Sequence, residues 1–298
     1  MRPPRVDRVN SRLVIGVLLA LALIGGARSL AQEASQPSAP RPVPDAQRVP
    51  TDVEDAVLFH AVLGTITRDL RLPVDGVTLE SLDGPTFLQA IESTKVRSDP
   101  SDLQDATGVA LGSRILVRSD RLSEMTIAQR ARLYAHELAH VAQVRLAANG
   151  EPSVNWIDEG HAEWVAFQVG DRLGHLSYAA SRERVRRRVR TSSLPRARFP
   201  ALSDLETADQ WVLAANQLGW AATYGQAFLA VDRLIERYSA ERLRELFRLS
   251  GESDSRLRAI DARSAFAGLF ARRSWNAVFP VDYRDFVAEF RDDLRAAR

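Results

Sequence analysis

Hydrophobic positions along most of this chain recur every three or four residues, the spacing that places side chains on one face of an α-helix. The pattern is most continuous after residue 126, where it predicts almost only helices. Helices are expected over residues 52–72, 126–148, 156–173, 176–190, 207–218, 223–238, 240–250 and 281–297. The second half of the chain is therefore predicted to be helical.

A different pattern occupies the region before residue 118. Three short runs rich in branched aliphatic residues predict strands over residues 77–82, 108–111 and 114–118. Together with the helices, they predict one α+β domain over residues 51–298, which is mostly helical. We expect its small N-terminal sheet and its C-terminal helical part to meet at the functional site.

The first 50 residues are expected to lie outside this domain. Residues 1–31 combine a basic start with an uncharged apolar run from Leu13 to Ala27. That run is short for a membrane span of about 20 residues and is typical of a secretory signal peptide, with an uncleaved anchor as the alternative. Residues 32–50, rich in Pro, Ala and Ser, predict a flexible linker. We therefore predict an exported protein, periplasmic or secreted, that contacts a membrane only if the N-terminal segment is retained.

Composition narrows the class of protein further. The chain has no cysteine, so neither a disulfide nor a lipid on a lipobox cysteine can hold it, and its stability must come from a core. Residues 1–31 carry five of the 40 basic and one of the 38 acidic side chains, so their removal leaves 35 and 37. This balance gives no indication of a nucleic-acid partner. We interpret the arginine-rich run 182–190 as a solvated helix face, with docking on anionic lipid or an envelope polymer as the alternative.

The strongest chemical signal is His-Glu-Leu-Ala-His at residues 136–140, within the helix expected over 126–148. His136 and His140 are four residues apart, so both imidazoles lie on one helix face and can bind one metal ion. Glu137 lies one position further round, where it can act on a water molecule that the metal holds. Catalytic zinc commonly has three protein ligands and an open fourth position. One zinc ion per chain is therefore the predicted cofactor.

A third ligand is expected beyond this helix, separated from His140 by eighteen residues. Glu159 lies in Trp-Ile-Asp-Glu-Gly, near the start of the next predicted helix. Glu163 follows on the same face and can accept a hydrogen bond from the outer nitrogen of a ligating histidine, with an ordinary solvated charge as the alternative. Asp158 is a candidate for the same role at the other histidine. His161 points away from this face and is interpreted as a packing residue.

These residues resemble the gluzincins, the zinc peptidases whose third ligand is a glutamate on a following helix. Residues 156–164, Trp-Ile-Asp-Glu-Gly-His-Ala-Glu-Trp, resemble the Trp-Leu-Asn-Glu-Gly segment of the aminopeptidase and leukotriene-A4-hydrolase family, and the gap between His140 and Glu159 matches as well. Tyr224, in Tyr-Gly-Gln-Ala-Phe, is similar to the segment that supplies that family's transition-state tyrosine. The alternative for Tyr224 is an aromatic side chain packed on the core.

The resemblance to bacterial peptidase-MA-like domains is closer still. Those domains tend to carry a Gly-x-x-x-Gly-x-x-Ile strand before the zinc helix, which is the helix that carries the two histidine ligands. Residues 108–115 match this strand. The resemblance implies a thermolysin-like core in which residues 108–117 bind the backbone of a peptide, with an ordinary sheet strand as the alternative. No Gly-x-Met-Glu-Asn segment precedes the zinc helix. The element by which the aminopeptidases hold a free amine is therefore missing, and the mode of cleavage stays open.

The resulting hypothesis is a secreted or periplasmic zinc peptidase that acts on a peptide or protein. Its expected ligands are His136, His140 and Glu159, with Glu137 as general base and Tyr224 as hydrogen-bond donor to the oxyanion. Two alternatives stay open. One is a zinc hydrolase that does not act on peptides, and the other is an envelope interaction module with a structural metal and no remaining catalysis.

Overall fold

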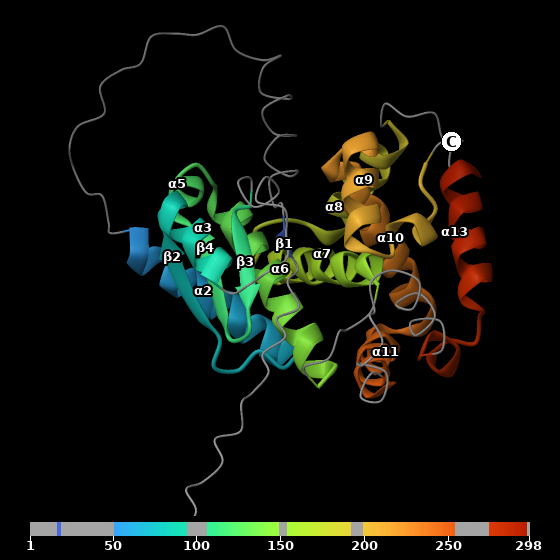
Figure 1. Ribbon diagram of the computed structural model, residues 1–298, viewed down its shortest axis with the longest axis horizontal. Helices are drawn as coiled ribbons and strands as arrows, with labels where there is room; N and C mark the ends of the chain where they lie inside the picture. Colours follow the sequence, from blue (N-terminus) through green and yellow to red (C-terminus); the bar gives the residue numbers. More distant parts are fainter. Residues whose placement is uncertain are drawn as a thin grey trace, which may run out of the picture.

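The fold is described from a computed structural model of the 298-residue chain, over residues 17–18, 51–93, 106–148, 154–191, 199–253 and 274–296. These residues are mostly helical, with one small sheet on the side of the N-terminal half (Figure 1). The expected class, α+β and mostly helical, is confirmed at this level. The linker predicted over 32–50 and most of the segment 1–31 lie outside the described residues.

The long helices follow the hydrophobic pattern of the sequence. They are α2 (Thr51–Asp69), α6 (Ile127–Leu146), α7 (Asn155–Arg172), α8 (Tyr178–Arg190), α9 (Ala208–Leu218), α10 (Trp220–Tyr238), α11 (Ala240–Ser253) and α13 (Tyr283–Ala296). Each corresponds to a predicted helix, with ends that differ by a few residues. Helix α10 begins at Trp220 rather than Thr223, because Gly219, at a φ of 90°, turns the chain directly into it.

The three expected strands are present, and a two-residue strand joins them. They are β1 (Val17–Leu18), β2 (Thr78–Leu82), β3 (Gly108–Leu111) and β4 (Arg114–Arg118), in the sheet order β1-β3-β4-β2. β3 and β4 form an antiparallel hairpin that turns at Gly112, whose φ is 62°, whereas β2 runs parallel to β4. β1 pairs antiparallel with β3, with Val17 opposite Val109 and Leu18 opposite Gly108.

Some short helical elements have no counterpart in the sequence prediction. They are α3 (Gly84–Ser93), α5 (Ser119–Leu122) and the 3₁₀ turn η2 (Leu202–Leu205). The start of α3 carries a capping signal, because Asp83 Oδ1 accepts a 2.8 Å hydrogen bond from the Thr86 N–H. Phe87 and Ile91, one turn apart, are buried against the sheet. An Asp-Gly-Pro start indicates a loop as readily as a helix, so the pattern alone did not single out α3.

Helix α7 lies between two hydrophobic cores. Val165, Ala166 and Val169 pack on one side with α2, α6 and the strands. On the other side, Trp156 and Phe167 join a core formed with α10, α11 and α13. Figure 1 shows α7 running through the centre of the molecule, between the sheet and the C-terminal helices. Because close-packed interiors leave side chains little freedom, α7 is held from both sides.

Helix α7 comes very close to α10 at Gly160. A Cβ at this position would lie 2.4 Å from the carbonyl oxygen of Ala227 in α10, which is closer than any side chain allows. A glycine directly after Glu159 therefore determines how near α10 lies to the first turn of α7.

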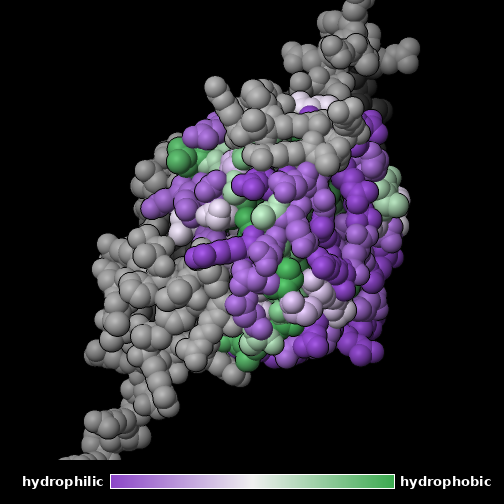
Figure 2. All heavy atoms as spheres, turned by 90° about the vertical axis from the view of Figure 1, so that its right-hand side faces the viewer, coloured by the Kyte–Doolittle hydropathy of each residue, from purple (hydrophilic) through white to green (hydrophobic). Residues whose placement is uncertain are grey.

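The face of the molecule that carries α13 is mostly hydrophilic. Figure 2 shows hydrophobic residues there as a narrow strip between polar ones. The apolar residues of α13, including Phe286 and Phe290, are buried against the C-terminal core. Within the described residues, no helix combines the length and the apolar character that a bilayer span requires.

Replacement of Gly160 by Ala is expected to push α7 and α10 apart and to lower the free energy of unfolding by about 1–3 kcal/mol, the usual cost of an overpacked core. Gly64 is the matched control, since it is also helical and a Cβ there meets only the flexible end of Arg68, at 3.7 Å. Gly64→Ala should leave stability unchanged or raise it by roughly 0.5–1 kcal/mol. Urea unfolding measures both, and equal stabilities of the two variants would contradict the close approach.

Candidate metal centre

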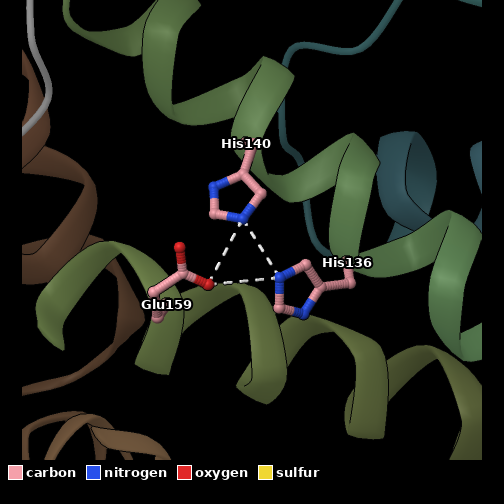
Figure 3. Close-up of side chains that lie close together, drawn as sticks. All are labelled: His136, His140 and Glu159. Carbon is pink, nitrogen blue, oxygen red and sulfur yellow. Dashed lines mark hydrogen bonds and ion pairs between the residues drawn. The ribbon is translucent and has the colours of Figure 1, made fainter. Parts of the chain in front are cut away.

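Three side chains from two helices converge in the interior (Figure 3). His136 and His140 extend from α6, and Glu159 extends from the first turns of α7. The two Nε2 atoms are 3.0 Å apart, and Glu159 Oε2 lies 3.4 Å from Nε2 of His136 and 3.6 Å from that of His140. Each residue is at most 5% exposed. In the part of the chain that the structure describes, no other three such residues bring their ligand atoms within 4.8 Å of one another.

A reciprocal capping box at the start of α6 fixes the register of the helix that carries both histidines. Thr126 Oγ1 accepts from the Gln129 N–H at 3.3 Å, and Gln129 Oε1 accepts from the Thr126 N–H at 2.8 Å. These bonds satisfy two backbone donors that would otherwise lack partners.

The start of α7 is held by hydrogen bonds and a ring contact of Trp156. Trp156 Nε1 donates to the hydroxyl of Tyr283 at 2.9 Å, and this hydroxyl donates to Glu206 at 2.7 Å. Trp156 is also stacked on Phe286, with 6.1 Å between ring centroids. The turn that carries Glu159 is thus anchored to α13 and to the segment after η2.

The spacing of the three ligand atoms fits a tetrahedral metal ion. With bonds of about 2.0–2.1 Å, the ligand atoms of a tetrahedral zinc site lie about 3.3 Å apart. The observed separations of 3.0, 3.4 and 3.6 Å scatter around that value. Glu159 Oε2 is buried and makes no hydrogen bond within the described residues, as expected of an atom whose partner is an ion. Two imidazoles and a carboxylate are also a donor set that catalytic zinc accepts.

The outer nitrogens of the histidines indicate which tautomer each ring adopts. Nδ1 of His136 lies 3.1 Å from Oε1 of Glu163, and Nδ1 of His140 lies 2.8 Å from Oε1 of Gln143. Both oxygens are acceptors, so in the neutral rings both protons are on Nδ1 and both Nε2 atoms carry lone pairs. Two lone pairs 3.0 Å apart, beside a carboxylate oxygen, repel one another unless a cation lies between them.

The pKa values of these three side chains also indicate a site that favours positive charge. Burial alone would lower the pKa of His136, but the carboxylates of Glu159 and Glu163, which lie close to its two ring nitrogens, outweigh it and raise that pKa to about 9. Burial acts the same way on His140, whose pKa the charge of Glu159 nevertheless raises. Burial opposes ionisation of Glu159, yet the two histidines hold the pKa of its carboxyl below the ordinary value. The surroundings therefore favour positive charge at this point, which protons or a metal ion can supply.

Glu163 lies one turn after Glu159, on the side of α7 that is directed at His136. Its Oε1 accepts from Nδ1 of His136, and its Oε2 is paired with Arg132. The Arg132 guanidinium in turn lies 4.2 Å from the ring centroid of Phe167. Burial would raise the pKa of Glu163, but Arg132 and His136 lower it to about 2. A carboxylate that stays ionised holds the orientation of His136 over a wide pH range.

The corresponding partner of His140 is Gln143, which sequence analysis did not single out. Asp158, the residue proposed for this role, contributes its backbone carbonyl, which accepts from Gln143 Nε2 at 2.7 Å. The structure thus gives the position next to Nδ1 to Gln143 and not to the Asp158 side chain. The signal in the sequence was the spacing, since residues three apart lie on neighbouring parts of one helix face.

His161 is buried in the interior, the arrangement expected of a packing residue. Its ring stacks on Trp164 and meets Phe247 edge-on, with centroid distances of 6.3 and 5.1 Å. Its Nδ1 lies 3.1 Å from Nε2 of Gln143. Burial lowers the pKa of His161 to about 3, so the ring is neutral and Nδ1 can accept this hydrogen bond.

Glu137 is fully buried beside the ligands. It is 0% exposed, and neither of its carboxylate oxygens has a hydrogen-bond partner within the described residues. Gly108 of β3 lies against it, since a Cβ there would be 3.4 Å from both Cγ and Oε1 of Glu137. Burial raises the pKa of Glu137 to about 7, although His136 and His140 act in the opposite direction. A carboxyl group with a pKa near neutrality is suited to accept and release a proton.

Tyr224 approaches the same centre from α10. Its ring centroid lies 6.1 Å from that of His136, and Trp211 packs against it at 5.0 Å. The hydroxyl is buried and has no hydrogen-bond partner within the described part of the chain. Burial, reinforced by the charges of Glu159 and Glu163, raises the pKa of Tyr224 well above its ordinary value. The hydroxyl therefore stays protonated and remains a donor.

The arginine-rich run forms most of α8. Arg184, Arg186 and Arg187 are exposed, as in a solvated helix face. Arg182 differs, because it is anchored to α10 through ion pairs of 2.5 Å with Asp232 and 2.5 Å with Glu236.

Comparisons with protein-family models, curated proteins and solved structures found no match for this chain. A function therefore has to be argued from the geometry and chemistry of the site itself.

In the metal-free protein, Glu137→Gln is expected to raise the free energy of unfolding at pH 8 but not near pH 4.5. The folded protein holds the Glu137 proton with a pKa of about 7, against 4.5 for the ordinary carboxyl. The bound proton therefore stabilises the fold fully below pH 4.5, and this stabilisation is lost as pH rises through 7, by about 3 kcal/mol in all. The amide of the variant does not titrate, so the variant does not lose stability in this way. Urea titrations with a chelator at pH 5 and pH 8 test this, and a difference that does not change with pH would contradict it.

Proposed function

We propose that the chain is a secreted or periplasmic zinc peptidase that hydrolyses peptide bonds in a peptide or protein substrate. One observation carries the proposal. A buried metal-binding triad lies next to two further buried groups, the carboxylate of Glu137 and the hydroxyl of Tyr224, whose polar atoms have no hydrogen-bond partner among the described residues. Unpartnered buried polar atoms are costly, and they gather where a reaction needs them.

Each group has a chemical role in this proposal. A zinc ion, when bound to His136, His140 and Glu159, supplies a Lewis acid that polarises a carbonyl and lowers the pKa of water. Glu137 takes the proton from the attacking water and delivers it to the leaving amine, a role that its buried position beside the three ligands supports. The Tyr224 hydroxyl donates a hydrogen bond to the oxyanion that forms from the scissile carbonyl.

The thermolysin-like arrangement implied by the resemblance also belongs to this proposal. In it, the edge of β3 next to the zinc helix binds the substrate backbone as an added strand. Two contacts support that role. Gly108 lies against Glu137, and the same strand pairs with Val17–Leu18 in antiparallel register. An extended peptide that takes the place of Val17–Leu18, which lie within the predicted signal peptide, would pass beside the general base.

The burial of Glu137 favours a catalytic over a purely structural metal site. A carboxylate without hydrogen bonds in the interior destabilises the fold above its pKa, and a structural site has no use for it. A metal that only holds the fold together would also tend to take four protein ligands, whereas three are present in the described residues. A zinc hydrolase that acts on another bond shares the same groups and is separated from a peptidase by the substrate test below.

Cleavage of a diverse peptide library by the zinc-loaded protein, followed by mass spectrometry, tests the proposal. The wild-type protein should cut peptides, and Glu137→Gln should keep its zinc but lose more than about 99% of the rate, since general base catalysis contributes 10²–10⁴-fold. The positions of the cuts also distinguish endopeptidase from exopeptidase action. A zinc-bound wild type that cuts nothing, or equal cutting by both proteins, would contradict the proposal.

Tyr224→Phe is expected to lower kcat by roughly 10²–10³-fold, the usual effect of removing one oxyanion donor, while KM and zinc affinity stay near wild type. Tyr178→Phe serves as the control. That tyrosine, on α8, is only partly buried, and its hydroxyl donates to Asp232 of α10. Steady-state rates on a peptide identified in the library test the prediction. A Tyr224→Phe enzyme with the wild-type kcat would remove Tyr224 from the reaction.

A further inference from the structure

Gln143 occupies a buried position between the two helices that carry the ligands. It is 1% exposed, and both ends of its amide are engaged. Oε1 lies 2.8 Å from Nδ1 of His140, while Nε2 donates to the Asp158 carbonyl at 2.7 Å and lies 3.1 Å from Nδ1 of His161. A single side chain of α6 thus contacts a metal ligand on its own helix and the peptide unit that precedes Glu159 on α7.

The contacts of Nε2 determine which way round the amide lies. The carbonyl of Asp158 can only accept a hydrogen bond, so the nitrogen of Gln143 must face it. The second contact agrees, because a neutral imidazole offers Nδ1 of His161 as an acceptor. The oxygen of the amide is then directed at His140, where it accepts the proton on Nδ1. Nε2 of His140 is left with a lone pair for the metal.

The two histidines are therefore held by unlike partners. His136 is held by the carboxylate of Glu163, whose charge Arg132 balances. His140 is held by a neutral amide that is itself fixed by α7. A neutral partner orients the ring without adding a further negative charge to the interior, which would be costly without a second cation.

We infer that Gln143 is a positioning residue of the metal centre: it fixes the tautomer and orientation of His140 and ties that ligand to the turn that carries Glu159. The inference rests on the proposed metal binding and not on the nature of the substrate. It explains why the α6–α7 junction contains a buried amide where an apolar side chain would otherwise pack.

The inference is tested with Gln143→Met, which keeps the length of the side chain but neither accepts nor donates these hydrogen bonds. Zinc affinity, measured by competition with a chelator, should fall about 10–100-fold, the usual effect of losing such a partner. The visible absorption spectrum of the cobalt-substituted protein should change as well, because the geometry of one imidazole is altered.

Gln226→Met is the matched control. Gln226 is equally buried, on α10, and its Nε2 donates to the Pro200 carbonyl at 2.7 Å, which lies in another part of the fold. Both variants lose one buried amide, so both should lose similar thermal stability when metal-free. Only Gln143→Met should lose zinc affinity and alter the cobalt spectrum.

A second variant keeps the test decisive if Gln143→Met does not fold. His161→Phe retains the aromatic packing on Trp164 and Phe247 but removes one of the two acceptors that orient the amide. It should lower zinc affinity by a smaller factor, roughly three- to tenfold. Wild-type zinc affinity and an unchanged cobalt spectrum in these variants, or an equal loss in Gln226→Met, would overturn the inference. A wild-type protein that binds no zinc would overturn the proposed function instead.

Discussion

The structure depends on one constraint: three electron-rich ligand atoms lie within 3.0–3.6 Å of one another in a buried place. Two imidazole lone pairs and a carboxylate repel one another unless positive charge lies between them. The raised pKa of His136 and the lowered pKa of Glu159 express the same requirement. Helix packing on both sides must therefore hold in place an arrangement that favours a cation.

The fold meets this constraint through α7. That helix is packed between two cores, and its start is anchored through Trp156 to Tyr283. Glu159 and Glu163, one turn apart, both face α6, while Gly160 between them lets α10 come close enough to bring Tyr224 next to His136. Glu159 thus belongs to the metal centre itself, whereas the position of Tyr224 depends on how closely α10 approaches α7.

Much of this was predictable from the sequence, because the relevant spacings are local. Helical periodicity predicted α6 and α7, and the four-residue spacing that joins His136 to His140 also joins Glu159 to Glu163. The role of Gln143 was not predicted, since its nitrogen is held by a carbonyl on another helix, a contact that depends on how the two helices pack. The pairing of Arg132 with Glu163 is tertiary in the same way. Helix α3 was missed because its first residues also suit a turn.

The metal centre can be tested directly by X-ray absorption at the zinc edge, on the purified protein loaded with one equivalent of zinc. We predict one tightly held ion per chain, bound by two imidazole nitrogens and one carboxylate oxygen at about 2.0–2.1 Å, with a single further light-atom ligand. In a Glu159→Ala variant the carboxylate contribution should disappear. A protein that loses its zinc on dialysis, or a spectrum with fewer than two imidazoles, would contradict the account.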